Sequence, residues 1–527
     1  VKSLTVYQRE KEKKMSKLVS FVVTIFASLF SVSLFAEFSI DTRLPIDAIP
    51  SIEIPELDWS AVYAEDAARS SKDEAPRYAI PHEVRISPAM DGIWEQTSRD
   101  TMRWSLRVVS RNAISLNLGF ERWELPTSAS MTVSATDGSM AIRPFTPEDN
   151  NIHGQLWTPA VQGDDLLIEI VVSLDEQKEV NQNIVLTSIN VGYRGFYEQG
   201  VGRSGSCNVD VVCAEGDLWW DEIPCVAVIS SGGSTFCTGF MVNNTSQDRT
   251  PFFMTANHCG ITSGNAASLV TYWHYQNSYC RVPGSGDSGS QGDGSLALFN
   301  TGATHLSSGS ASDYTLVVLN TAPDEAWEIS YCGWDASGAD ASSAIAIHQP
   351  STDEKRISFE DQPTTTTAYL GESIPGDGTH VRVEDWDLGT TEPGSSGSPL
   401  FNQDHQVIGQ LHGGYASCTS QTSDWYGKFS ISYPAGLSTH LDTAGTGQLI
   451  INTLPGTGMS ITPGESTVHV CTSPCLDPDP AEVVYTIANN SPSMISYRVE
   501  TVLNTGFILI NGGSSDTGNI FAGASVD

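Results

Sequence analysis

One short segment, TEPGSSGSPLF at residues 391–401, could supply a nucleophile for attack on a carbonyl carbon. Such attack needs a hydroxyl on a tight turn, with backbone N–H groups that converge on the oxygen that becomes negative. Glycines permit both the turn and the close approach of a substrate, and Ser396 has Gly394 before it and Gly397 after it. We expect Ser395 to project to the other side. The alternative interpretation is a flexible linker, because Gly, Ser and Pro cluster in loops.

Two further residues could activate that serine. His258 follows the apolar run 251–254 and precedes Cys259, so a disulfide would pin a base that must come within about 3 Å of the proton it removes. Asp313 opens the apolar run 314–319, where a carboxylate is costly to bury unless a group such as an imidazole N–H donates to it. Taken singly, the histidine is equally well interpreted as a neighbour of a structural cystine, and the aspartate as the first residue of a strand.

The order of these residues along the chain separates two classes of hydrolase. An α/β-hydrolase would carry G-x-S-x-G, with its acid and histidine after the nucleophile. Here residue 398 is serine, and His258 and Asp313 both precede Ser396. This is the order of chymotrypsin-type proteases. The three residues therefore predict acyl transfer through a His-Asp-Ser triad.

Residues from about 202 to 453 resemble the bacterial lysyl endopeptidases of the trypsin-like serine protease superfamily. The matching runs, in order, are GSCNVDVVC, FMVNNTSQDR, TANHCG, YWHYQNSYCR, AIAIHQP with EKRIS, EPGSSGSPLF and IGQLHGG. The resemblance implies an all-β protease domain with two six-stranded β-barrels. In it His258 would be the general base, Asp313 the residue that orients the base, and Ser396 the nucleophile. The oxyanion hole would be formed by the backbone N–H groups of Gly394 and Ser396.

All ten cysteines lie between Cys207 and Cys475, and an exported chain meets an oxidising compartment in which disulfides form. Zinc is the alternative, but no second cysteine pair has matching spacing and the chain lacks HExxH. Spacing alone does not reveal which cysteines pair. The resemblance implies Cys207–Cys418, Cys213–Cys280 and Cys237–Cys259, and we add Cys225–Cys332 within the protease domain and Cys471–Cys475 near the C-terminus.

The segment after the nucleophile could bind a substrate. Residues 407–411 are expected to form a strand that leads into His412, Gly413 and Gly414. An extended peptide could pair with this backbone, while the glycines leave room for a side chain to pass. The resemblance places the carboxylate at the base of the specificity pocket at Asp424. A desolvated carboxylate is stabilised by a cation that pairs with it, so we expect Lys or Arg at the P1 position of the substrate.

Two comparisons bear on that specificity. In lysyl endopeptidases a tryptophan stacks near the histidine that corresponds to His412, whereas Tyr369 and Leu370 are the nearest candidates here. The preference for Lys over Arg therefore stays open. A glutamyl endopeptidase also carries motifs like TAxHC and SGSP, but it needs cationic groups in its specificity pocket. Asp424 would place a negative charge there and therefore argues against that specificity.

Activation must also differ from that of trypsin. Digestive trypsins carry an aspartate before the nucleophile that pairs with the new N-terminus, whereas this chain has Ser395 at that position. We therefore expect latency to come from the N-terminal domain, which would cover the cleft until an exposed linker near residues 202–204 is cut. Arg203 would suit self-cleavage by a protease specific for Lys or Arg.

The N-terminal part of the chain is predicted to contain a signal peptide and a separate β-rich domain. Residues 1–36 are predicted to be a signal peptide with an upstream extension, because basic residues precede the apolar run 18–35. A membrane anchor is the alternative, since that run approaches spanning length. Residues 37–203 are predicted to form a β-rich propeptide domain, because period-two alternation marks half-buried strands. The alternating runs are 104–109, 114–118, 166–172 and 184–187.

The rest of the chain is predicted to contain two further domains. A chain of 527 residues is too long for one core. Residues 204–453 are the predicted protease domain, and residues 454–527 are predicted to form a small Ig-like β-sandwich that stops abruptly and could be incomplete. The run at 200–206 matches GxGxxG, but no helical periodicity follows, so we interpret it as a linker and not as a dinucleotide site.

The net charge of the chain limits the classes of partner that it is expected to bind. The chain has 62 acidic and 27 basic residues, a net charge of -35, and this repels nucleic acid and anionic lipid surfaces. We expect a secreted monomer that acts on protein or peptide substrates with a basic P1 residue and needs no cofactor or metal; calcium near residues 292–295 stays open. The alternative is a catalytically silent secreted binding or adhesion protein on a protease-like scaffold, because a fold does not guarantee function.

Overall fold

The computed structural model describes residues 43–68, 74–195 and 203–456, together with the backbone of short strands between 459 and 526. The predicted signal peptide and the Cys471–Cys475 pair lie outside the described residues. Helices are few and short. They are α1 (Trp59–Ala68), α2 (Gln177–Asn183), α3 (Phe429–Ser432) and α4 (Ser438–Leu441), with single turns η1 (Ile46–Ala48), η2 (Pro147–Asp149), η3 (Ala214–Trp219), η4 (Ile223–Cys225), η5 (Asn257–Cys259), η6 (Ala266–Ser268), η7 (Glu325–Trp327) and η8 (Tyr433–Leu437). Among the described helices, none has the length and apolar character needed to cross a bilayer.

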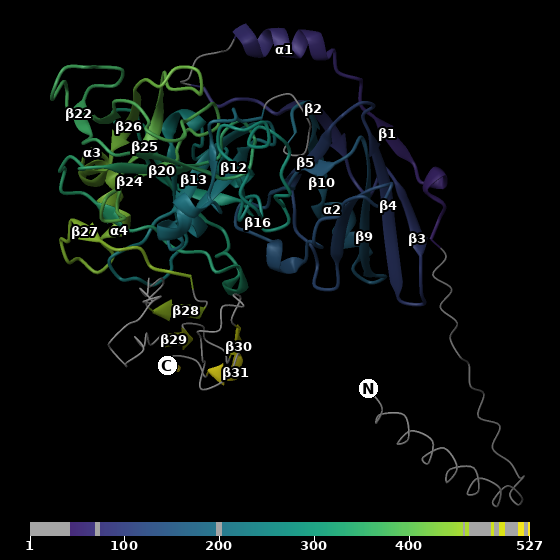
Figure 1. The fold of residues 1–527 in the computed structure, drawn as a ribbon. Helices are drawn as coiled ribbons and strands as arrows, with labels where there is room; N and C mark the ends of the chain where they lie inside the picture. The colour runs from purple at the N-terminus through teal and green to yellow at the C-terminus, as the bar shows by residue number, and fades with distance from the viewer. Residues whose placement is uncertain are drawn as a thin grey trace, which may run out of the picture. The chain divides into compact units, whose positions relative to one another are not determined.

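The N-terminal region is built from two five-stranded sheets (Figure 1). The first has the order β1 (Ser51–Glu53), β4 (Thr101–Val109), β9 (Asp165–Ser173), β6 (Ser130–Ala135), with β3 (Ile93–Gln96) on β4. The second has the order β2 (Ala79–Ile86), β10 (Val185–Gly192), β5 (Ser115–Arg122), β7 (Leu156–Trp157), with β8 (Val161–Gln162) on β5. The four predicted alternating runs lie in β4, β5, β9 and β10. One core joins the two sheets, because Leu106 and Ile168 of the first pack with Leu118 and Ile189 of the second.

The region that carries the candidate triad is built from two larger sheets. The seven-stranded sheet has the order β16 (Phe299–Thr301), β15 (Val270–Tyr272), β12 (Val226–Ser231), β13 (Thr235–Met241), β14 (Phe252–Ala256), β18 (Tyr314–Leu319), β17 (Ala303–Gly309). The ten-stranded sheet has the order β11 (Val209–Asp210), β21 (Arg356–Glu360), β20 (Ala344–His348), β24 (Pro399–Asn402), β25 (Val407–Gly414), β26 (Asp424–Lys428), β23 (His380–Val383), β22 (Thr365–Thr367), with β19 (Trp334–Asp335) and β27 (Ile450–Ile451) off this path. The chain is thus mostly β with several antiparallel sheets, as predicted.

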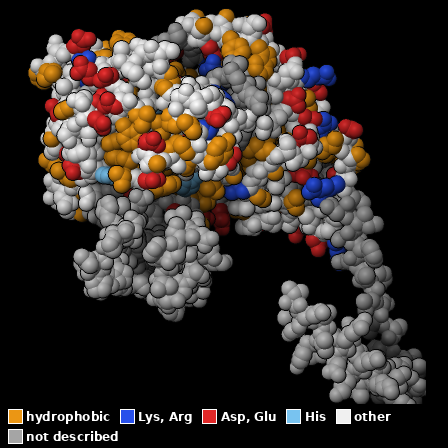
Figure 2. All heavy atoms as spheres, in the orientation of Figure 1, with side chains coloured by type: hydrophobic (Ala, Val, Ile, Leu, Met, Phe, Trp, Pro, Cys, Tyr) orange, Lys and Arg blue, Asp and Glu red, His pale blue; other side chains and the backbone are white. Residues whose placement is uncertain are grey.

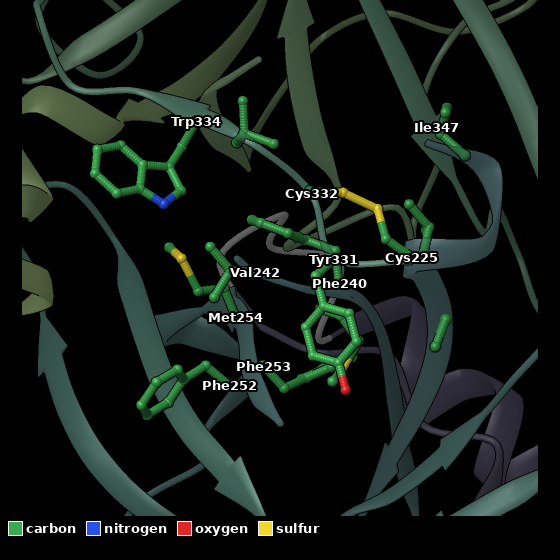
Figure 3. Close-up of a cluster of buried hydrophobic side chains, with 14 of the residues drawn as sticks. Cys225, Phe240, Val242, Phe252, Phe253, Met254, Tyr331, Cys332, Trp334 and Ile347 are labelled. Carbon is green, nitrogen blue, oxygen red and sulfur yellow. A yellow bond between two sulfur atoms is a disulfide. The ribbon is translucent and has the colours of Figure 1, made fainter. Parts of the chain in front are cut away.

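A common core holds these two sheets together (Figure 3). It combines Phe240 and Met254 from the seven-stranded sheet with Trp334 and Ile347 from the ten-stranded one. The Cys225–Cys332 disulfide lies inside this cluster (Figure 3). The candidate site is therefore supported from both sides by packed, rigid strands.

Beyond residue 456 only strand backbone is described. It consists of β28 (Met459–Thr462), β29 (Thr486–Asn489) and β32 (Ser525–Val526) in one sheet, and β30 (Ile495–Glu500) with β31 (Ser515–Ile520) in another. These pairings are antiparallel. Figure 2 shows Asp and Glu side chains spread over the visible face of the described residues, in keeping with the net charge of -35.

Candidate active site

His258 lies on a single turn at the end of a strand. β14 ends at Ala256, and η5 then turns sharply because Gly260 adopts a left-handed φ of 76°. The next residue, Cys259, is bonded to Cys237 on β13. The imidazole is therefore carried on backbone that is fixed by a strand on one side and by a disulfide on the other.

Asp313 meets His258 because β14 and β18 are paired. Asp313 immediately precedes β18 and has a left-handed φ of 51°. Its Oδ2 lies 2.8 Å from His258 Nδ1, and its Oδ1 accepts from the backbone N–H of His258 at 2.9 Å. The two side chains are only 7% and 4% exposed. Two donors thus stabilise the carboxylate against the cost of burial, as the sequence predicts.

This contact also assigns the tautomer of His258. An ionised carboxylate can only accept hydrogen bonds, so the proton of the neutral imidazole is on Nδ1 and the lone pair is on Nε2. The described residues provide no hydrogen-bond partner for this Nε2. A buried, unpaired ring nitrogen is what a general base needs before it takes a proton.

Ser396 lies in a turn that only glycine permits on both sides. Gly394 and Gly397 have φ values of 96° and 84°. A Cβ on Gly394 would lie 2.3 Å from the Phe236 ring, and one on Gly397 would lie 2.3 Å from Thr255 Oγ1. The segment is therefore a tightly packed turn and not a flexible linker.

This turn is joined to the element that carries His258. The carbonyl of Ser396 accepts from Thr238 N at 2.9 Å and lies 3.9 Å from Cys259 Sγ. Ser395 instead points into the protein, where its Oγ lies 2.8 Å from His348 Nδ1. The structure therefore joins His258 to Asp313, places the backbone of Ser396 beside Cys259, and turns the side chain of Ser395 toward His348. The predicted contact of the Ser396 hydroxyl with His258 stays a prediction.

A second imidazole accompanies the first. The ring of His412 stacks on that of His258 with a centroid distance of 5.5 Å, and its Nε2 lies 3.8 Å from Asp313 Oδ2. Tyr369 stacks on the other face of His412 at 3.6 Å and 6°. The stacking position that the sequence comparison left open is thus filled by Tyr369 and not by Leu370.

His380 is a site residue that sequence reasoning missed. Its Nε2 lies 2.9 Å from His412 Nδ1, and its Nδ1 lies 2.8 Å from Thr379 Oγ1. Burial, and secondarily the neighbouring His412, lower the pKa of His380 to about 4. The only signal in the sequence is a histidine within an alternating strand, which does not reveal its partner.

The low pKa of His380 predicts a loss of stability in acid. The folded state keeps this ring neutral while the unfolded state binds a proton near the ordinary histidine pKa of 6.5, so the free energy of unfolding falls as the pH drops from 6.5 toward 4. We expect His380→Gln to remove about 3 kcal/mol of this pH dependence. Urea unfolding at pH 7, 5.5 and 4, in a Ser396→Ala background that cannot digest itself, measures it. The half-buried His305 supplies the control His305→Gln; equal slopes in both variants would contradict the prediction.

Asp424 lies at the start of β26, opposite Gly414 of β25. Its side chain is inaccessible, with 0% exposure, and its Oδ2 accepts from Trp386 Nε1 at 2.8 Å and Thr391 Oγ1 at 2.6 Å. A Cβ on Gly414 would lie 2.1 Å from Asp424 Oδ1. The buried carboxylate thus abuts the glycine strand that was predicted to pair with substrate, whereas Trp386 and Thr391 carried no recognisable signal.

The described cysteines are all bonded. The structure has Cys207–Cys418, Cys213–Cys280, Cys225–Cys332 and Cys237–Cys259.

Arg203 was expected in an exposed linker, and that expectation is wrong for this state. Its side chain is 7% exposed and forms ion pairs with Asp353 at 3.1 Å and Glu354 at 3.5 Å. Burial of two carboxylates nearby draws the guanidinium inward, because unpaired buried charges are costly.

Comparison with known proteins agrees with the resemblance seen in the sequence. Residues 201–427 match the family model described as Lysyl endopeptidase, C-terminal domain. A lysyl endopeptidase of Pseudomonas aeruginosa is 30% identical over 305 residues, which are 54% of this chain and 63% of that protein. The chain therefore spans less than two thirds of the length of this relative. The predicted similarity to lysyl endopeptidases is confirmed.

Similar solved structures are more distant. The active form of the Rv3671c protease from M. tuberculosis is 15% identical with a TM-score of 0.27, over 46% of this chain and 92% of that one. A Glu endopeptidase is 15% identical with a TM-score of 0.28, over 44% and 95%. The HtrA-type protease AlgW with a tripeptide is 12% identical with a TM-score of 0.29, over 44% and 64%.

Proposed function

We propose, from the match of residues 201–427 to the lysyl endopeptidase family model, that this chain is a secreted serine endopeptidase that cleaves after Lys or Arg. The observation that carries the proposal is the buried His258–Asp313 pair, which leaves Nε2 unbonded beside the turn of Ser396. In this proposal residues 204–453 are the protease domain and their two sheets correspond to the two β-barrels. Residues 37–203 are the propeptide domain and residues 454–527 a separate β-sandwich.

The geometry supports acyl transfer. Ser396 Oγ attacks the carbonyl carbon while its proton passes to His258 Nε2, and Asp313 stabilises the imidazolium that forms. The N–H groups of Gly394 and Ser396 stabilise the oxyanion. His258 then gives the proton to the leaving amine as the C–N bond breaks. Water, deprotonated by the same imidazole, releases the acyl group from Ser396.

The buried carboxylate supports the specificity. Asp424 is held by two donors on one oxygen, and pairing with a substrate cation would offset the cost of its burial. Backbone pairing with Gly413 and Gly414 would orient the peptide. A Lys ammonium and an Arg guanidinium both satisfy this charge, so we propose a basic P1 residue with Lys preferred, on the strength of the family.

The experiment that tests this function uses the secreted full-length chain. A fluorophosphonate is expected to label it, and a peptide library with Lys, Arg or Glu at P1 is expected to be cut after Lys or Arg. A chain that takes no label and cuts no peptide would instead fit the silent binding scaffold. Cleavage after Glu would contradict the role of Asp424.

Contacts of the N-terminal region support a role in latency. The N–H of Phe236 donates to the carbonyl of Pro76 at 3.0 Å, and the N–H of Tyr78 donates to the carbonyl of Ser234 at 2.8 Å. The Phe236 ring packs on Gly394 of the nucleophile turn. A cavity of about 440 Å³ is lined both by residues 74–77 and by the substrate strand, including Gly413 and Gly414.

We therefore propose that the N-terminal domain blocks the cleft until it is removed. A peptide substrate and the segment 74–77 would compete for the same walls, so we expect the intact chain to be at least tenfold less active than the processed form. N-terminal sequencing of the active product, with its activity compared with that of the intact chain, measures this. A fully active product that still begins before residue 74 would overturn the proposal.

A further inference from the structure

The two peptide groups that form the proposed oxyanion hole are anchored by their carbonyl oxygens. The carbonyl of Pro393, which shares a peptide plane with the N–H of Gly394, accepts from Ser351 N at 2.7 Å. The carbonyl of Ser395, which shares a plane with the N–H of Ser396, accepts from Ser398 N at 3.0 Å. Because the C=O and N–H of a trans peptide point to opposite sides, each anchor fixes the direction of the N–H group on its own peptide.

The two anchors differ in origin. Ser398 belongs to the nucleophile turn itself, so its bond to Ser395 is local. Ser351 is 42 residues before Pro393 in the sequence and has a left-handed φ of 51°, so this anchor comes from a loop that is distant in sequence. The Pro393–Gly394 peptide is thus the part of the hole whose orientation depends on a separate loop.

Two side chains hold that loop against the turn. Thr238 Oγ1 donates to the carbonyl of Gly394 at 2.8 Å and accepts from Gln349 N at 3.1 Å, and Glu392 makes the contact with Ser351 itself. The Oε2 of Glu392 accepts from Ser351 Oγ at 3.0 Å. The Oε1 of Glu392 accepts from Gly205 N at 2.7 Å and from Asn208 Nδ2 at 2.9 Å. Glu392 therefore lies between the loop of Ser351 and the first residues of the proposed protease domain. Hydrogen bonds to a charged acceptor are about twice as strong as neutral ones.

The N-terminal segment on the other side of Glu392 is itself fixed. Cys207 is bonded to Cys418, and a Cβ on Gly205 would lie 2.4 Å from Cys418 Sγ. Asn208 is buried and also donates to the carbonyl of Gly205 at 3.0 Å. The segment thus offers Glu392 two donors that cannot easily move away.

We propose that Glu392 is a positioning residue for the oxyanion hole. Its carboxylate ties the segment 205–208 to Ser351, and Ser351 in turn holds the Pro393–Gly394 peptide with its N–H toward the reacting oxygen. This inference rests on the proposed protease function. It gives the N-terminal segment of the protease domain a role in catalysis that does not require an aspartate before the nucleophile.

The test separates transition-state binding from ground-state binding in the processed enzyme, obtained from the full-length chain by its own maturation. A peptide aldehyde with a basic P1 residue forms a bond from Ser396 Oγ to its carbonyl carbon, the proton moves to His258, and the oxygen becomes an oxyanion in the hole. Benzamidine carries a cation for the Asp424 pocket but forms no such adduct. Loss of the hole should therefore weaken the aldehyde and leave benzamidine unaffected.

We expect Glu392→Ala to lower kcat and to raise the Ki of the aldehyde about ten- to hundredfold, with KM and the Ki of benzamidine within about twofold. Glu392→Gln keeps an acceptor for Gly205 and a polar contact to Ser351, and it should restore both values to within about threefold. Ser351→Ala, which keeps the backbone anchor, should show a smaller loss of the same kind. Glu215, which is exposed, supplies the matched control Glu215→Ala.

Several outcomes would overturn the proposal. Equal weakening of aldehyde and benzamidine in Glu392→Ala would mean a merely structural role, and unchanged kinetics would mean no role. Failure of Glu392→Gln to rescue would rule out the hydrogen-bond explanation. If Glu392→Ala does not mature, Ser351→Ala carries the same test. A parent chain that takes no fluorophosphonate label would instead refute the protease function on which this inference rests.

Discussion

Ser396→Ala is expected to lower kcat by at least about 10⁴-fold and to abolish labelling by a fluorophosphonate. The reason is that the hydroxyl is the atom that forms the acyl-enzyme, and no neighbouring group can replace it. Ser395 points to His348 in the interior, 2.8 Å from its Nδ1. The remaining activity would come from the oxyanion hole and substrate binding alone. The measurement is hydrolysis of a P1-lysine peptide amide, with active-site titration of the parent.

A matched substitution separates this effect from damage to the fold. Ser308 is an exposed serine on β17, so Ser308→Ala should retain the activity and the label of the parent. Benzamidine should still bind to Ser396→Ala, because the Asp424 pocket is untouched. Labelling of Ser396→Ala as strong as that of the parent would show that another residue is the nucleophile.

Asp424→Asn is expected to lower kcat/KM for a P1-lysine substrate about 10²- to 10³-fold. Removing one partner of a buried ion pair costs about 3 to 5 kcal/mol, and each 1.36 kcal/mol corresponds to about tenfold in rate. The amide keeps the size of the carboxylate and can still accept from Trp386 and Thr391. What it loses is the negative charge that a P1 cation would pair with.

Substrates without a P1 charge provide the internal control. Hydrolysis of an activated ester with an apolar P1 residue should change less than about threefold in Asp424→Asn, because the triad is intact. Asp404 is exposed, and Asp404→Asn should leave both reactions unchanged. A proportional loss on both substrates would indicate that Asp424 supports the fold and does not select the substrate.

The candidate triad residues could be singled out from the sequence because each has a local signature. A turn flanked by Gly394 and Gly397 requires left-handed backbone that few other residues adopt, and their φ values are 96° and 84°. The apolar runs that carry His258 and Asp313 predict strands, and neighbouring strands are the simplest way to bring their ends together. The order of the three residues then selected one class of protease.

The partners of that triad were not predictable. His380 and His412 are 32 residues apart and meet because β23 and β25 flank β26 in the ten-stranded sheet. Trp386 reaches Asp424 across 38 residues, and Glu392 reaches Gly205 across 187. Strand order and register depend on the simultaneous packing of many side chains. No single pattern of residue types encodes them.

The same difference explains one position that the sequence left open and one expectation that the structure changed. Tyr369 stacks on His412 although the alignment left the position open between two residues, because stacking depends on the path of a loop and not on its composition. Arg203 looked exposed in a Gly- and Ser-rich run, yet Asp353 and Glu354 pair with it. A segment rich in Gly and Ser indicates turns. Its composition does not show which distant carboxylates form ion pairs with a cation in that segment.

Residue types and their spacing alone thus predicted which atoms could react and the sheet-forming segments that carry them, whereas the expected charge of the P1 residue came from the family resemblance. Only the tertiary structure decided how the imidazole of His258 is oriented, which rings stack beside it, and which groups anchor the peptides of the nucleophile turn. The physical reason is the distance along the chain over which each kind of interaction acts. Backbone preference and hydrophobic alternation act over a few residues, whereas hydrogen bonds such as those of Glu392 require segments from both ends of the protease domain to be packed first.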